Sequence, residues 1–302
     1  MNNYLLIVLL WCFISFSLHT RAQTIVKIEN YLKQATSRSQ QGAAVYGNNL
    51  FHFTSEGICN IYDLDRRRHL GQMRYERLEI KHCDTVCFGT YKVDEKDEFP
   101  VIYISGSNVD KLDSYGLIWV YRILHNGDNW NLELHQIIKT PAVKDMGICP
   151  DALLDNYDGN MWIMGWKKNL TKQQKDGHGA YLFFSKFRTP SLKDGIMDEK
   201  GIRNVTLSMS DVITSFVVNN AHAIQQGICL RSHKVYIPYG VSSLGYQGID
   251  IVSLDEGRVV RNVNLMGTGV REPEAVFFYK GDLFIADQAT TLKRIVNFKE
   301  NE

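Results

Sequence analysis

The amino-acid sequence predicts an all-β protein that closes into a single β-propeller of five blades. Two observations carry this prediction. A unit made of a short apolar strand, a polar turn and an aromatic or β-branched second strand recurs five times along the 302 residues. No strong amphipathic helical stretch interrupts these units, which disfavours a parallel sheet with crossover helices.

Each copy of the unit joins an inner strand to a second strand rich in aromatic and β-branched residues. In chain order, the paired segments are 41–45 with 50–53, 84–88 with 101–104, 150–154 with 161–164, 226–230 with 235–238, and 273–277 with 283–286. Further strand-like segments follow each pair, as 59–64 and 69–74 do after the first. Four antiparallel strands per repeat form one blade of a propeller.

The number of units decides the number of blades. Intervals of 43, 66, 76 and 47 residues separate their aligned second positions, which are Gly42, Thr85, Asp151, Gly227 and Glu274. The two long intervals carry loop insertions, notably 167–179 and 189–204. Too few residues follow Glu274 for four strands, so the strand-like segment 24–32 is expected to supply the outer strand of the last blade. Splitting the longest interval gives six blades, which is the alternative.

The chain begins with an apolar segment that differs from the rest. Residues 4–18 form a nearly unbroken apolar run, and Thr20 and Ala22 place small residues where a signal peptidase expects them. The run is shorter than the roughly 20 residues that a membrane-spanning helix needs. Residues 1–22 are therefore expected to be a signal peptide and 23–302 the propeller domain, without a transmembrane span. The absence of Lys or Arg from residues 1–3 keeps an uncleaved anchor as the alternative.

The charge balance excludes one class of partner. The whole chain has 34 Lys and Arg against 33 Asp and Glu, and removing the leader, which contains Arg21, leaves no net charge. Its charged runs are short and lie between apolar stretches, so they are typical of solvated loops rather than of a nucleic-acid patch. The expectation is a monomer at the cell surface, in the periplasm or in the medium, with no nucleic-acid partner.

Five cysteines follow the leader, and their number is odd. They are spread through strand-like apolar contexts, whereas disulfide scaffolds use dense, even sets in short chains. We expect free thiols, with Cys87 and Cys229 acting as compact apolar side chains at the inner strands. A zinc site at His82, Cys83 and Cys87 is disfavoured because their spacing does not match a paired CxxC set.

The first residues of the inner strands are the candidate ligand site. In a propeller these positions gather around one mouth of the central channel although they are far apart in sequence. Here they are polar, namely Gln41, His82 or Asp84, Asp151, Gln226, and Glu272 or Glu274. Such a ring offers oxygen ligands to calcium, or hydrogen bonds to a small polar ligand. The alternative is that these side chains cap strands, fix turns and hold channel water.

Two aromatic residues are candidates for a carbohydrate platform. Trp166 and Tyr239 sit just past second strands, where the chain returns to loops. Aromatic ring faces pack well against the apolar faces of sugars. Most other aromatic residues are expected in the cores of the blades.

Several motifs resemble known propellers. Residues 41–48 (QGAAVYGN), 82–88 (HCDTVCF), 98–105 (EFPVIYIS) and 226–229 (QGIC) are similar to a family of secreted bacterial propellers without an assigned activity. The Gln-Gly strand starts and 271–275 (REPEA) resemble, more distantly, the blade starts of two enzyme groups. These are five-bladed glutaminyl-peptide cyclotransferases and six-bladed lactonases of the gluconolactonase type.

The resemblance implies two different chemistries. In the cyclotransferases a carboxylate at the start of the second blade is the general acid/base, and that place falls near His82 or Asp84. The tryptophans that line the cyclotransferase pocket are missing from the corresponding inner strands here. In the lactonases a divalent cation is bound by carboxylate and asparagine side chains, a role that the resemblance gives to Glu274 and Asp151.

Two classes of function follow from these observations. The first is a non-catalytic binding protein that presents its channel mouth and loops to a glycan, a peptide or a protein. The alternative is a propeller enzyme, either a lactonase-like hydrolase or a glutaminyl-cyclotransferase-like enzyme, that uses the carboxylates of the channel mouth. The sequence contains no contiguous catalytic motif that decides between them.

Overall fold

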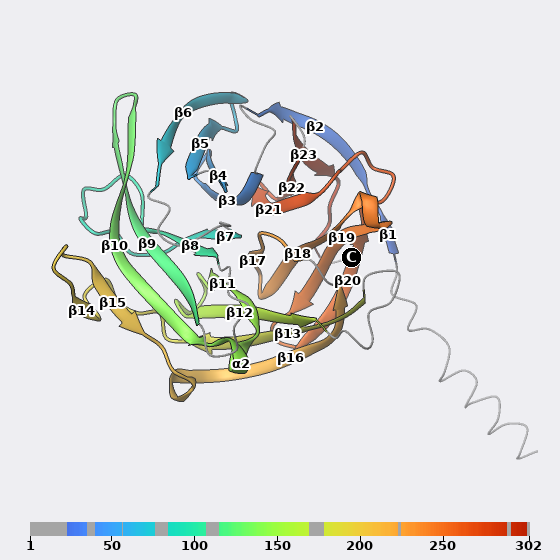
Figure 1. Cartoon of the computed structure of the whole chain (residues 1–302). Helices are drawn as coiled ribbons and strands as arrows, with labels where there is room; N and C mark the ends of the chain where they lie inside the picture. The colour runs from blue at the N-terminus through green and yellow to red at the C-terminus, as the bar shows by residue number, and fades with distance from the viewer. Residues whose placement is uncertain are drawn as a thin grey trace, which may run out of the picture.

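The computed structural model confirms the all-β fold. Its described residues are 23–34, 40–55, 57–75, 84–106, 115–168, 178–222, 225–288 and 291–300. Their strands form five sheets arranged around a central axis, as Figure 1 shows. The protein is a five-bladed β-propeller, and the six-bladed alternative is wrong. The expected signal peptide, residues 1–22, lies outside the described residues.

The first three blades follow the predicted order of strands. Blade 1 contains β3 (Gln40–Tyr46), β4 (Asn49–Thr54), β5 (Ile58–Asp63) and β6 (Arg68–Arg74). Blade 2 contains β7 (Thr85–Phe88), β8 (Ile102–Gly106), β9 (Tyr115–Asn126) and β10 (Asn129–Ala142). Blade 3 contains β11 (Ile148–Leu154), β12 (Met161–Lys168), β13 (His178–Phe187) and β16 (Val212–His222).

The last two blades join the two ends of the chain. Blade 4 contains β17 (Cys229–Arg231), β18 (Lys234–Val241), β19 (Tyr246–Ser253) and β20 (Arg258–Asn264). Blade 5 contains β21 (Pro273–Tyr279), β22 (Asp282–Asp287), β23 (Thr291–Val296) and β2 (Lys27–Lys33). The antiparallel pairing of β2 with β23 confirms that the N-terminal segment closes the last blade.

Three strands extend blades in ways that the sequence did not predict. The short β1 (Gln23–Ile25) pairs in parallel with β20, so the N-terminal segment contributes to two neighbouring blades. The insertion in blade 3 crosses to blade 2, where β15 (Arg203–Thr206) pairs in parallel with β10 and β14 (Ile196–Met197) follows outside it. Blades 2 and 4 therefore have covered outer edges.

Helical structure in the described residues is confined to short connecting turns. These are α2 (Val143–Met146), η1 (Met209–Asp211) and η2 (Ser242–Leu244). No helix in these residues is long and apolar enough to cross a membrane.

The hydrophobic core is divided into five clusters, and each lies between two neighbouring blades. Alternate residues of a strand point to opposite faces of its blade. On β18, for example, Val235 packs toward blade 3 and Tyr236 packs toward blade 5. On β8, Ile104 packs toward blade 1 and Tyr103 toward blade 3. Burial on both faces of every blade holds the ring together and fixes the inner strands around the axis.

Candidate functional site

The inner strands β3, β7, β11, β17 and β21 surround the axis (Figure 1). Each is the first strand of its blade's meander, so the five strands run in the same direction along the channel. Their first residues lie at one end and their last residues at the other. We call the first end the acidic mouth, defined by Asp84, Asp151, Glu272 and Glu274, and the second end the apolar basin, defined below.

Gly227 brings three blades into contact at the acidic mouth. Its backbone N–H donates to the carbonyl oxygen of Glu274 in blade 5, with an N···O distance of 2.8 Å. A Cβ atom at this position would lie 2.5 Å from the carbonyl oxygen of Asp84 in blade 2. The next residue, Ile228, donates its N–H to the Thr85 hydroxyl over 3.1 Å. The missing side chain of Gly227 allows this close approach and narrows the channel.

Asp151 is the most enclosed carboxyl group of the acidic mouth. Its side chain lies on β11, the residue is 3% exposed, and its Oδ1 atom has no hydrogen-bond partner in the described part of the chain. Burial raises the pKa of Asp151 well above its ordinary value, and the nearby charge of Asp84 raises it further. Hydrogen bonds with Thr85 and Ser105 oppose this shift. Burial therefore disfavours the ionised form of Asp151.

Glu274 is the second buried carboxyl group, and it titrates close to neutral pH. It lies on β21 and is 3% exposed. Burial raises its pKa to about 8, although the side-chain amide of Gln288 donates a hydrogen bond to it. The negative charges of Glu272, Asp84 and Asp287 add to the increase. Because Asp84 acts on both Asp151 and Glu274, the four carboxyl groups form one electrostatic cluster.

A buried ion pair supports this cluster from blade 5. Lys293 on β23 donates to Asp287 at the end of β22, and both side chains are almost fully enclosed. The backbone N–H of Arg271 also donates to Asp287, over 3.1 Å. The sequence analysis missed this pair. Lys293 stands out as a cation in an otherwise apolar blade core, which is the signal that could have identified it.

The structure brings together part of the predicted ring. The residues that interact electrostatically are Asp84, Asp151, Glu272 and Glu274. Gln226 is half-buried next to Gly227, and its backbone N–H donates to Pro238 over 3.1 Å. Gln41 is buried on β3, where its backbone hydrogen-bonds the ring of His52. His82 lies outside the described residues.

The described residues do not assemble a metal centre. No group of three or more His, Cys, Asp or Glu side chains among them is close enough to hold a metal ion. Among the described residues, Asp151 and Glu274, which the lactonase resemblance pairs as ligands, belong to no such group. Calcium stays a prediction. Cys83, a member of the disfavoured zinc site, lies outside the described residues. The Cys87 thiol donates a hydrogen bond to the carbonyl oxygen of Ala152.

The two expected platform residues have different surroundings. Tyr239 is 4% exposed and its ring stacks on that of His222, with 3.7 Å between centroids, so it has no open face for a sugar. The expectation for Tyr239 is wrong because the end of β18 is covered rather than solvent-facing. Trp166 is half-buried and packs against the core cluster between blades 3 and 4. A role for Trp166 in carbohydrate binding stays a prediction.

Tyr239 belongs to a buried polar network between blades 3 and 4. The His222 Nδ1 atom lies 2.8 Å from Asp250 Oδ2, and Asn262 donates to both Asp250 and the Tyr239 hydroxyl. Burial alone would raise the pKa of Asp250, but its interactions with His222 and Asn262 hold it below the ordinary value. The network fixes the ends of β16 and β18 beside the acidic mouth. Sequence reasoning did not find it because its members come from four separate strands.

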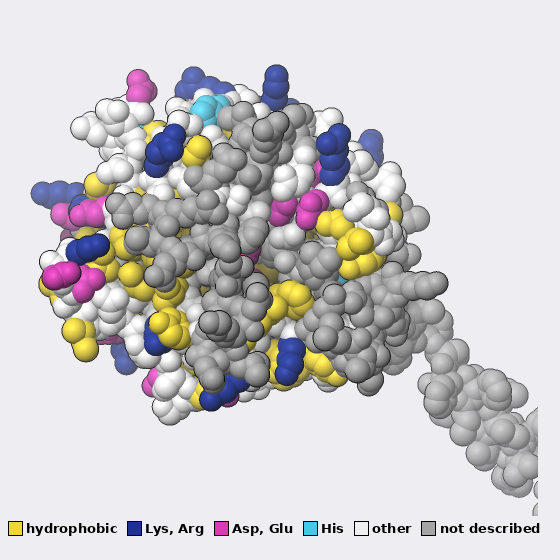
Figure 2. Space-filling model, in the orientation of Figure 1, with side chains coloured by type: hydrophobic (Ala, Val, Ile, Leu, Met, Phe, Trp, Pro, Cys, Tyr) yellow, Lys and Arg dark blue, Asp and Glu magenta, His cyan; other side chains and the backbone are white. Residues whose placement is uncertain are grey.

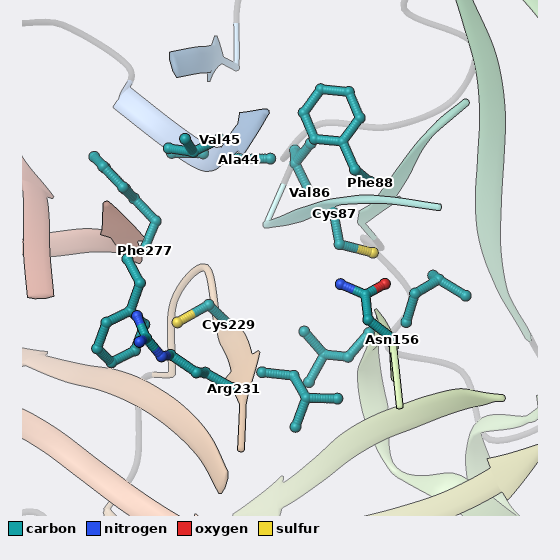
Figure 3. Close-up of a pocket in the computed structure, with 14 residues that line it drawn as sticks. Ala44, Val45, Val86, Cys87, Phe88, Asn156, Cys229, Arg231 and Phe277 are labelled. Carbon is teal, nitrogen blue, oxygen red and sulfur yellow. The ribbon is translucent and has the colours of Figure 1, made fainter. Parts of the chain in front are cut away.

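The apolar basin is a cavity of about 260 Å³ at the opposite end of the channel. All five inner strands line it, and Figure 3 shows Ala44, Val86, Phe277 and Cys229 around the opening. Its polar side chains are Asn156 and Arg231. The Arg231 guanidinium lies over the Phe278 ring at 4.5 Å, and its Nε atom is 3.2 Å from a Glu300 oxygen.

The thiols of the inner strands have low reactivity. Cys59, Cys87 and Cys229 are free cysteines, as expected. Burial raises the pKa of Cys87 to about 12 and raises that of Cys229 as well. Because the thiolate is the reactive form, these side chains serve as small apolar residues around the basin.

Comparisons with known proteins found matches only among solved structures. No protein-family model matches the sequence, and no curated protein matches it either. Among solved structures, Myxococcus xanthus glutaminyl cyclase is 10% identical with a TM-score of 0.47, covering 90% of this chain and 97% of the cyclase. A Thermus thermophilus protein named as an oxidoreductase (glucose dehydrogenase) is 9% identical with a TM-score of 0.48, covering 90% of this chain and all of its own. Staphylococcus aureus virginiamycin B lyase is 12% identical with a TM-score of 0.42, covering 91% of this chain and all of the lyase.

A glutaminyl cyclase is thus among the matched structures, as the resemblance in the sequence led us to expect. The function has to be argued from the residues of the channel itself.

Proposed function

We propose that this protein is an exported ligand-binding propeller whose acidic mouth takes the positively charged amino terminus of a peptide. The observation that carries the proposal is the convergence of Asp84, Asp151, Glu272 and Glu274 with raised pKa values at the two buried positions. Neighbouring carboxyl groups repel one another when ionised, and an ammonium group placed among them relieves that repulsion. Export is supported by the apolar leader.

The exposure of the cluster fits a ligand that enters from solvent. Asp84 and Glu272 are half-buried, whereas Asp151 and Glu274 lie deeper. A cation can therefore be attracted by the outer carboxylates and neutralised by the inner ones. Figure 2 shows one face of the molecule, with Lys and Arg side chains mainly around the rim and Asp and Glu side chains both at the rim and nearer the middle.

A peptide is favoured over a simple cation because amide side chains accompany the carboxyl groups. Gln226 is half-buried at the start of blade 4, and Gln288 already donates to Glu274. Amide groups can both donate to and accept from a peptide backbone. The residues of the mouth thus provide charge recognition for the amino terminus and hydrogen bonds for the first peptide units.

Acid–base catalysis is the second candidate function, and one observation favours it. The pKa of Glu274 is about 8. A general acid or base works best when its pKa lies near the working pH, which here is close to neutral. Buried acids with such shifts concentrate at catalytic sites. An enzyme would bind the same amino terminus and then change the peptide, so turnover separates the two functions.

Calorimetric titration with a peptide library tests the proposal. We expect binding of peptides with a free amino terminus and at least tenfold weaker binding, about 1.4 kcal/mol, when that terminus is acetylated. Asp151→Asn and Glu274→Gln should weaken binding of the free peptide, because each removes a carboxyl group that can ionise and pair with the bound ammonium. Glu199→Gln, the same change on the exposed insertion far from the axis, is the matched control.

Mass spectrometry of the titrated peptides completes the test. Unchanged peptides support a binding protein, whereas a mass change that disappears in Glu274→Gln supports the enzyme. Equal affinity for free and acetylated peptides would overturn recognition of the amino terminus.

A further inference from the structure

Strand β16 is the outer edge of blade 3, and nothing pairs with it on its outer side in the described part of the chain. Figure 1 shows it along the outer rim of the propeller. It is 11 residues long, and its sequence VITSFVVNNAH contains no Asp, Glu, Lys or Arg. A long, uncharged edge rich in β-branched residues is a ready template for another strand.

The other outer edges are protected by the usual means. The outermost strands of blades 4 and 2, β1 and β14, contain only three and two residues. The outer strands of blades 5 and 1, β2 and β6, have seven residues each and carry charged side chains, including a basic residue near or at both ends. Short length and charge are the devices that keep sheet edges from pairing. β16 is neither short nor charged.

The side chains of β16 also favour pairing. Ile213 is 57% exposed and Val217 is 43% exposed, although both are large and apolar. Between them, Phe216 is half-buried and stacks on Phe184 of the neighbouring strand, which fixes the backbone of this stretch. Covering Ile213 and Val217 would remove apolar surface from water.

We propose that β16 pairs antiparallel with β16 of a second copy of this chain about a two-fold axis. The distribution of charged residues on the outer strands favours self-pairing through β16. A two-fold pairing of β6 would place Arg68 opposite Arg74, and one of β2 would place Lys27 opposite Lys33, so like charges oppose each other there. β16 places no charge opposite any other along its 11 residues.

The position of β16 keeps this interface separate from the channel. The strand lies on the rim, and the acidic mouth and apolar basin lie at the two ends of the axis. A dimer formed through β16 leaves both ends accessible, and the proposal does not depend on the proposed ligand. It departs from the expectation of a monomer, which rested on composition alone.

Sedimentation of the purified protein between about 1 and 100 μM, the range in which weak interfaces associate, tests the proposal. The wild type is expected to shift from monomer to dimer over this range. Val217→Lys and Thr214→Lys place a charge on exposed positions of β16 and should keep the protein monomeric at the highest concentration. Gln72→Lys adds the same charge at an exposed position of β6 and should behave as the wild type. Equal unfolding midpoints establish that the variants are folded.

Hydrogen exchange locates the interface independently of the variants. Amide protection of residues 212–222 should increase with protein concentration, while protection of residues 68–74 should not. A protein that stays monomeric at all concentrations overturns the proposal. A dimer that survives both β16 variants, with unchanged exchange in β16, overturns it as well.

Discussion

The two ends of the channel are built from the same five strands but have opposite chemistry. At the acidic mouth, carboxyl groups from blades 2, 3 and 5 interact, and Gly227 holds three blades together through backbone contacts. At the apolar basin the same strands line a cavity of about 260 Å³, mainly with small and apolar side chains. One end of the channel therefore concentrates carboxyl groups, and the other end contains a cavity.

This difference shows how repeated strands can place charged side chains at one end of a channel and apolar side chains at the other. Gly227 allows the backbones of blades 2, 4 and 5 to approach closely at the acidic mouth. Burial there, and then the charges of neighbouring carboxyl groups, raise the pKa values of Asp151 and Glu274. The basin holds no comparable group of like charges, since the positive charge of Arg231 is paired with Glu300.

The largest expected effect concerns the thiols of the basin. At pH 8 the native protein should react with iodoacetamide at Cys87 roughly a thousandfold more slowly than an unfolded chain, because a pKa of about 12 leaves very little thiolate. Mass spectrometry of timed samples, with and without urea, measures both rates. Rapid labelling of native Cys87 would show that the basin is wetter and more open than the structure indicates.

The next effect compares added volume at the two ends. Gly227→Val should lower the free energy of unfolding by about 4 kcal/mol, because its side chain would collide with the backbone oxygens of Asp84 and Glu274. Val45→Ile adds one methylene group beside the basin and should change stability by less than about 1 kcal/mol. Urea denaturation measures both. Similar losses for the two variants would contradict the difference in packing.

The smallest effect concerns pH. The pKa of Glu274 is about 8 in the folded protein and near its ordinary 4.5 in the unfolded chain, so stability from this group is complete below pH 4.5 and is lost as the pH rises toward 8. Between pH 4.5 and 7 the free energy of unfolding should fall by about 3 kcal/mol through Glu274. Glu274→Gln should remove this part of the pH dependence, and Glu199→Gln should not. Identical slopes for all three proteins would contradict the shifted pKa.

The sequence predicted the inner parts of the blades best. Strands that are buried on both faces carry long apolar and aromatic patterns, so the first two strands of every blade could be recognised as repeats. The outer strands carry less of this signal because they are exposed. For this reason the parallel pairing of β1 with β20 and the crossing of β15 to blade 2 were not predicted.

The candidate site was predicted in part for the same reason. The repeat aligned Asp151 and Glu274 and placed Asp84 one position before their equivalent, Thr85, so all three were expected near the starts of inner strands. It could not reveal Asp287 and Lys293, which belong to a different strand position in a single blade. Nor could it show that Tyr239 stacks on His222, because that contact joins two blades.

The pairing of β2 with β23 imposes an order on folding. One partner is among the first residues of the propeller to be synthesised and the other is near the last, so the ring cannot close until residues 291–296 have left the ribosome. Until then blade 5 lacks its third strand, and the faces that it shares with blades 1 and 4 stay incomplete. A chain released early would therefore present open apolar surfaces at both seams of the ring, where chaperones or proteases would recognise it.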